Sequence, residues 1–134
     1  EQDEGVRKAL EKKLDIERIT QYYKKISSSY VSEDIIRLQE RSSKIVIYGT
    51  SRLAMICKKQ LDAAKIPFEG YVVTDGQLKV DNIEDKHVYY LSEIVCESKE
   101  NIGFILAIQP INLDSIKQEL DKFGITNYCE PYVM

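Results

Sequence analysis

The four residues that follow the apolar run "KIVIY" carry the clearest chemical signal in this sequence. They are Gly49, Thr50, Ser51 and Arg52, and a predicted helix begins at Ser51. A glycine turn between a strand and a helix binds phosphate because backbone N–H groups point at the anion and the helix dipole attracts negative charge. Ser51 can add a hydroxyl, and Arg52 can add a bidentate contact to phosphate. The turn therefore predicts a site for a small phosphorylated ligand.

The same turn departs from the dinucleotide-binding pattern at one position. That pattern uses glycine for a tight turn, for backbone approach to the pyrophosphate and for close packing of helix on strand. The three places hold Gly49, Ser51 and Ala54, of which Gly49 suits the first purpose and Ala54 the third. Ser51 crowds the place of a pyrophosphate, although its hydroxyl suits a smaller anion. In the alternative interpretation, Thr50 and Ser51 only cap the helix and Arg52 lies in solvent.

Two further candidate binding residues follow later strands. Asp75 stands 26 residues after Gly49, near the end of a second predicted strand, where an acidic residue commonly binds the hydroxyls of a ribose. Asp75 and Gly76 are also a common turn pair, so turn chemistry alone can explain the carboxylate. Gln109 stands in "AIQPIN", beyond a later strand, where it and Pro110 are expected at the rim of the same pocket.

The other reactive residues predict neither a catalytic nor a metal site. His87 is the only histidine, and base catalysis normally needs an orienting partner that the neighbouring sequence lacks. Cys57, Cys96 and Cys129 are an odd number without metal-ligand spacing, so we expect buried, reduced thiols. No P-loop lysine follows Gly49, and no GxSxG motif is present. Whether the protein is an enzyme stays open, because this chain holds no self-sufficient catalytic constellation.

Composition and charge limit the partners to expect. The chain has 134 residues, of which 43% are hydrophobic and 31% are charged, with a net charge of -3. Residues 1–43 hold equal numbers of acidic and basic residues, so residues 44–134 carry the whole excess. There is no basic stripe to neutralise phosphates, and we expect no nucleic-acid partner. No apolar run approaches the ~18 residues of a membrane span, and no signal peptide is evident, so we expect a cytoplasmic protein.

From Lys44 onward, apolar strand patterns alternate with helical patterns. The predicted strands are "KIVIY", "GYVVT", "HVYYL", "IGFILAI" and "NYCEPYV". The predicted helices cover residues 51–65, 92–95 and about 112–123, and the polar stretch that follows Asp75-Gly76, up to Lys86, is expected to be a loop. This alternation predicts an α/β fold, a Rossmann-like three-layer domain over residues 44–134 with a mostly parallel sheet. Ligands of such sheets bind beyond the carboxyl ends of the strands, where Gly49–Arg52, Thr74–Gly76 and Ile108–Asn112 are expected to meet.

Residues 1–43 are expected to form a helical extension or linker. An apolar stripe at spacings of three and four predicts one helix; its members are Ile16, Ile19, Tyr23, Ile26 and Tyr30. Ser32 can cap a second short helix, whose expected buried residues are Ile35, Ile36 and Leu38. The stripe can pack on the sheet domain, or it can pack on another domain or on a second copy as a homodimer. Because the chain begins with Glu1, we expect a piece of a longer protein.

The segments from Lys44 onward also resemble a known family. The resemblance lies in "KIVIYGTSRLAMICKKQLDAAKIPFEGYVVTDG", "VYYLSEI", "GFILAI" and "LDKFGITNY". These resemble a Rossmann-like accessory domain of bacterial surface-polysaccharide biosynthesis enzymes. That domain is similar to the N-terminal domain of sugar acyltransferases and is also appended to glycosyltransferases, glycerophosphotransferases and methyltransferases. The resemblance spans roughly residues 44–132.

The resemblance implies binding without chemistry in this chain. In the acyltransferases this domain binds the sugar-nucleotide substrate, and a separate β-helix carries the reaction. Gly49 and Ser51 would then face the phosphate or sugar, and Asp75 the nucleoside. The usual family turn has more glycine and often a histidine, which Thr50, Ser51 and Arg52 replace here. No hexapeptide repeat follows, so no catalytic role is carried over.

Three functions remain as hypotheses. The first is a non-catalytic domain that binds a nucleotide or nucleotide-sugar within a larger glycan-biosynthesis protein of the glycosyltransferase type. The second is a degenerate Rossmann-like domain that serves oligomerisation or interdomain contacts, motivated by Ser51 and by the bulky "QPI" at the rim. The third is half of a transferase active site, completed by another domain.

Overall fold

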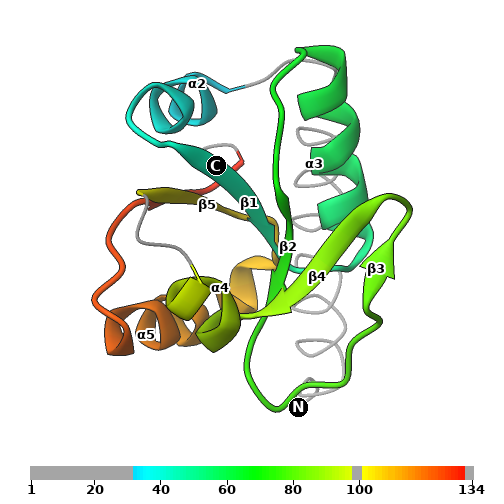
Figure 1. Cartoon of the computed structure of the whole chain (residues 1–134). Coiled ribbons are helices and arrows are strands. Elements are labelled where there is room, and N and C mark those ends of the chain that lie inside the picture. Colours follow the sequence, from blue (N-terminus) through cyan, green and yellow to red (C-terminus); the bar gives the residue numbers. More distant parts are fainter. Residues whose placement is uncertain (1–31, 98–100, 132–134) are drawn as a thin grey trace, which may run out of the picture.

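The computed structural model describes residues 32–97 and 101–131 of the chain. The predicted helical stripe between Ile16 and Tyr30 therefore lies outside the described residues. Within them the protein has an α/β fold, in which helices cover both faces of a sheet (Figure 1).

The sheet has six strands, and all of its neighbouring pairs except one are parallel. The strands are β1 (Lys44–Tyr48), β2 (Gly70–Val73), β3 (Asn82–Ile83), β4 (Lys86–Tyr90), β5 (Ile102–Leu106) and β6 (Tyr128–Cys129). They lie in the order β3-β4-β2-β1-β5-β6. In the central register, Val46 lies opposite Gly70 on one side and opposite Phe104 on the other. The predicted α/β fold with a mostly parallel sheet is confirmed.

The helices divide between the two faces of the sheet. They are α2 (Glu33–Glu40), α3 (Arg52–Ala63), α4 (Leu91–Glu97) and α5 (Leu113–Lys122), with a 3-10 turn, η1 (Pro110–Asn112), before α5. Helices α2 and α3 pack in one core, and α4 and α5 pack in the other. Figure 1 shows α4 and α5 together on the side of the sheet opposite to α3.

After Lys44, strand β1 is apolar because it contributes to both cores. Ile45 and Ile47 pack with the α2–α3 side, whereas Val46 and Tyr48 pack with the α4–α5 side. These four side chains are at most 4% exposed. Burial of each aliphatic side chain of this kind contributes about 1.5–3 kcal/mol. A central parallel strand therefore shows a continuous apolar run rather than an alternating one.

Helix α2 begins after the predicted cap residue, Ser32, but one residue predicted to be buried in it is exposed. The Ser32 hydroxyl oxygen accepts a hydrogen bond from the Ile35 N–H at 3.4 Å. Ile35 and Leu38 are fully buried, but Ile36 is 42% exposed, so its predicted burial was wrong. Residues three apart share a helix face, and the position directly after Ile35 points away from it.

A small hairpin replaces part of the loop predicted between the second and third strands. Asn82 and Ile83 form β3, which pairs antiparallel with the start of β4. Glu84, which has φ of 56°, makes the turn between the two strands. A two-residue strand is too short for a periodic pattern to predict, and the loop interpretation was wrong at these residues.

The path of the chain reverses direction in the middle of the sheet. From β1 the chain proceeds outward through β2 to β4, and it then crosses by α4 to β5 and β6 on the other side of β1. The carboxyl ends of β1 and β5 are neighbours, and the connections leaving them diverge. In open α/β sheets this is the place where ligands bind.

Candidate functional site

A cavity of about 490 Å³ lies at the carboxyl ends of β1, β2 and β5. Three chain segments supply its walls: the turn after β1, the turn after β2, and the connection from β5 into α5. The lining residues are Tyr48, Gly49, Thr50, Ser51, Val73, Thr74, Gln77, Ile108, Gln109, Asn112, Ser115 and Ile116. Four of the six predicted binding residues are among them, namely Gly49, Thr50, Ser51 and Gln109.

Gly49 allows β1 to leave the sheet between its two neighbours. Its φ is +115°, a conformation that side chains of L-residues rarely adopt. A Cβ atom at this position would lie 2.9 Å from the Ala107 carbonyl oxygen and 3.1 Å from the Ile108 Cγ2. The Gly49 N–H donates to the Val72 carbonyl at 2.8 Å, which keeps the turn attached to β2. The tight turn and the close backbone approach therefore both require glycine.

Helix α3 begins at the wall of the cavity. Ser51 occupies the N-cap position with an extended backbone, and its side chain makes no capping hydrogen bond. The Ser51 carbonyl accepts the N–H of Met55 at 3.2 Å, so the helix itself starts regularly. No acidic residue stands in the first turn to neutralise the helix dipole. This end of α3 thus presents a partial positive charge and an exposed hydroxyl to the cavity.

Tyr48 and Thr74 join two walls of the cavity by a hydroxyl pair. The Tyr48 Oη and Thr74 Oγ1 atoms lie 2.6 Å apart, across the carboxyl ends of β1 and β2. Burial raises the pKa of Tyr48, so the phenol is neutral at physiological pH. Each hydroxyl has one hydrogen, and one of the two is used between them. The pair therefore retains one O–H group that can be donated to a ligand.

Two predicted binding residues, Asp75 and Arg52, are not among the lining residues. The Asp75 Oδ1 atom accepts a hydrogen bond from the Ser92 N–H at 3.1 Å, in the first turn of α4. Glu93 accepts the Tyr90 N–H at 3.0 Å, so two carboxylates satisfy donors at the start of this helix. Arg52 is exposed in the first turn of α3. The carboxylate of Asp75 is thus engaged by α4 rather than aimed into the cavity.

The chemistry of the walls is polar and uncharged. Among the described residues that line the cavity, none is acidic or basic. Hydroxyl and amide side chains predominate, and they come from Thr50, Ser51, Thr74, Gln77, Gln109, Asn112 and Ser115. Such groups bind neutral hydrogen-bonding ligands, and among the described walls the partial positive charge that attracts an anion lies at the start of α3. Within residues 32–97 and 101–131, no three potential metal ligands lie close enough together to hold an ion.

In the described part of the chain, the cysteines and the histidine form no second candidate site. Cys57 is fully buried, and burial raises the pKa of its thiol to about 12. Cys129 is partly buried, and desolvation raises its thiol pKa to about 12 as well. Cys96 is exposed, so the expectation that all three thiols are buried was wrong for this residue. His87 is exposed at the start of β4. Its ring packs edge-on against the Tyr89 ring, with 4.4 Å between the ring centres.

Sequence reasoning missed Tyr48 and Gln77 as site residues. Tyr48 ends a predicted strand, and residues at the carboxyl ends of parallel strands are the signal that could have identified it. Gln77 follows the predicted turn by one residue, and no sequence pattern separates it from its neighbours. None of the helices in the described part of the chain has the length and hydrophobicity of a membrane span.

No protein-family model, curated protein or solved structure matches this chain. Its function is therefore inferred from the cavity and from the elements that build it.

Proposed function

We propose that this protein contains a Rossmann-like accessory domain, residues 44–134, that binds a nucleotide or a nucleotide-sugar without catalysing a reaction. The observation that carries the proposal is the juxtaposition of the Gly49 turn, the uncapped start of α3 and a cavity of about 490 Å³. A phosphate group of the ligand would lie against Ser51 and the first turn of α3. The neutral remainder would occupy the cavity.

Cavity size and strand order support this assignment. Pockets for small molecules and cofactors commonly enclose about 300–1,000 Å³, a range that includes this cavity. The parallel strands lie in the order β4-β2-β1-β5-β6, which corresponds to the 3-2-1-4-5 order of nucleotide-binding sheets. In that arrangement the ligand crosses the sheet edge at β1, where Gly49 lies here.

The biological setting follows from the resemblance described above and is part of the same proposal. The domain would belong to a cytoplasmic protein of bacterial surface-polysaccharide biosynthesis, of the glycosyltransferase or another transferase type. Residues 1–43 would be its helical extension, which either contacts other domains of a longer chain or forms a homodimer. The chemistry would then reside outside residues 44–134.

A second candidate function is an interaction module whose ligand site is degenerate. Two apolar side chains near the cavity favour it: Leu78 is 102% exposed and Ile111 is 85% exposed. Leu78 adjoins the lining residue Gln77, and Ile111 stands between the lining residues Gln109 and Asn112. Strongly exposed apolar side chains beside a cavity are suited to contact with another protein surface.

A negative charge added at the start of α3 tests the binding proposal. The variant Ser51→Asp keeps a good N-cap residue but places a carboxylate where the phosphate would bind. Ser32→Asp makes the same substitution at the N-cap of α2, away from the cavity, and is the matched control. The probes are UDP, UDP-glucose, ADP, NAD and inorganic phosphate at millimolar concentration, and the measurement is the thermal midpoint of unfolding.

We expect at least one probe to raise the midpoint of the wild type and of Ser32→Asp, but not that of Ser51→Asp. A ligand present at about 100 times its Kd stabilises the folded state by about 2.7 kcal/mol. Absence of any shift in the wild type would refute the binding proposal and favour the interaction module. Equal shifts in wild type and Ser51→Asp would show that the phosphate does not bind at α3.

A further inference from the structure

In the turn after β2, sequence patterns indicate Asp75 as the binding residue, but other residues of this turn line the cavity. Asp75 is held by the backbone of Ser92, whereas Thr74 and Gln77 on either side of it line the cavity. We infer that Gln77, supported by Thr74, is the specificity-determining residue for the uncharged end of the ligand, an inference that rests on the proposed function. The site thereby selects phosphorylated ligands whose second end is neutral.

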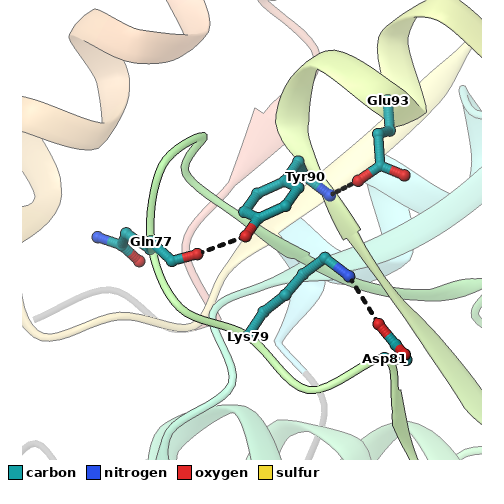
Figure 2. A network of polar contacts seen from close by, with 5 residues as sticks. All are labelled: Gln77, Lys79, Asp81, Tyr90 and Glu93. Atoms are coloured by element: carbon teal, nitrogen blue, oxygen red, sulfur yellow. Dashed lines mark hydrogen bonds and ion pairs between the residues drawn. The ribbon is translucent and has the colours of Figure 1, made fainter.

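The backbone of Gln77 is held by two hydrogen bonds. Its N–H donates to the Thr74 carbonyl at 3.2 Å, which closes the turn. Its carbonyl accepts the Tyr90 hydroxyl at 2.7 Å, from the end of β4. The Lys79 ammonium lies 5.1 Å from the centre of the Tyr90 ring and 3.4 Å from an Asp81 carboxylate oxygen (Figure 2). Lys79 therefore also holds the Tyr90 ring in place.

The side chain of Gln77 remains available while its backbone is held. Figure 2 shows its amide extending away from the Tyr90 ring, on the opposite side from the carbonyl that Tyr90 binds. The residue is exposed, and it lines the cavity. A free amide on a backbone that is already held is suited to recognise a ligand. Little conformational entropy of the loop is then lost on binding.

The chemistry of an amide differs from that of the carboxylate usually found after this strand. A carboxylate only accepts hydrogen bonds, and it suits a pair of ribose hydroxyls. The Gln77 amide has two N–H donors and one carbonyl acceptor, and Gln109 presents the same groups from the segment after β5. Together with the spare O–H of the Tyr48–Thr74 pair, these groups match a neutral moiety that both donates and accepts.

Two kinds of ligand carry such a moiety next to a phosphate. One is a nucleoside phosphate, whose base edge offers donors and acceptors, and the other is a sugar phosphate with its hydroxyls. UMP and glucose 1-phosphate are the probes that distinguish these sources. Glucose 1,6-bisphosphate is the test of charge selection, because its second end is anionic and no described lining residue has a positive charge to bind it.

Affinities of three variants measured by isothermal titration calorimetry test the inference. We expect Gln77→Glu to weaken binding of the better neutral-ended probe by about tenfold, since two donors are lost and a negative charge is added. Gln39→Glu makes the same charge change on the exposed surface of α2 and should bind like the wild type. Asp75→Asn keeps an acceptor for Ser92 and should also bind like the wild type. The bisphosphate should bind the wild type more weakly than glucose 1-phosphate does.

The outcomes separate this inference from the proposed function. If the wild type binds a probe but Gln77→Glu binds it equally well, the role of Gln77 is refuted and nucleotide or sugar-phosphate binding stands. If Asp75→Asn weakens binding more than Gln77→Glu does, the Asp75 carboxylate recognises the ligand and the inference is overturned. If the wild type binds none of UMP, glucose 1-phosphate, UDP, UDP-glucose, ADP and NAD, the proposed function fails and this inference fails with it.

Discussion

Replacement of Gly49 by alanine tests the structural basis of the cavity. Two costs add at this position. The φ of +115° is strained for any residue with a Cβ, at about 1–3 kcal/mol. The added methyl would also lie 2.9 Å from the Ala107 carbonyl oxygen, and overpacking of this kind typically costs about 1–3 kcal/mol. We therefore expect Gly49→Ala to lower the free energy of unfolding by about 2–6 kcal/mol.

Gly76 provides the matched control for the clash. Its φ is +89°, so alanine is strained there as well, but a Cβ at Gly76 would meet no atom within 4 Å. Gly76→Ala should therefore lose only the conformational contribution, about 1–3 kcal/mol. Urea denaturation followed by circular dichroism measures both variants. With a urea m-value of about 2 kcal/mol/M, the excess cost at Gly49 lowers the midpoint by about 0.5–1.5 M more.

Equal destabilisation by the two alanines would refute the argument. It would mean that the close approach between the Gly49 turn and the Ala107 carbonyl is not maintained in solution. The cavity wall between β1 and β5 would then not have the described geometry.

Two further measurements examine the buried core. Tyr71 is fully buried, and its hydroxyl has no hydrogen-bond partner in the described part of the chain, so Tyr71→Phe should stabilise the protein by about 1–2 kcal/mol in urea denaturation at pH 7. Burial raises the pKa of Tyr71 from 10.0 to about 12, so the unfolded state ionises first and wild-type stability falls between these pH values. The advantage of phenylalanine should therefore grow over that range, and a constant advantage would contradict burial of the phenol. Iodoacetamide at pH 8 should modify Cys96 in the folded protein and Cys57 only after unfolding, because Cys57 is buried and its pKa is raised to about 12. Equal labelling rates in peptide mass spectra would contradict this core assignment.

Local patterns in the sequence predicted most of the described fold. The runs "IVIY" and "IGFILAI" contain no charged residue because β1 and β5 are covered on both faces, and that pattern can be recognised without a structure. The Ser32 cap was likewise predictable, since capping depends on residues within one turn. Strand β3 and the exposure of Ile36 were not predicted. The first depends on pairing with β4, and the second on which helix face meets the sheet.

The candidate site divides in the same way. Gly49, Thr50, Ser51 and Gln109 were proposed from local motifs, and they line one cavity because parallel strands bring their carboxyl ends to one edge. The role of Tyr48 depends on its contact with Thr74, and the role of Gln77 depends on its contact with Tyr90. In each pair the two residues are distant in sequence. Asp75 has the residue type and spacing of a ribose ligand, but the start of α4 accounts for one of its oxygens.

The sequence by itself determined the succession of strands and helices and the glycine turn that opens the site, because backbone preference and hydrophobic periodicity act over a few residues. The tertiary structure alone decided which side chains after each strand face the cavity and which are used to cap a helix. That choice depends on strand register and on helix placement, and both are set by packing between segments far apart in the chain.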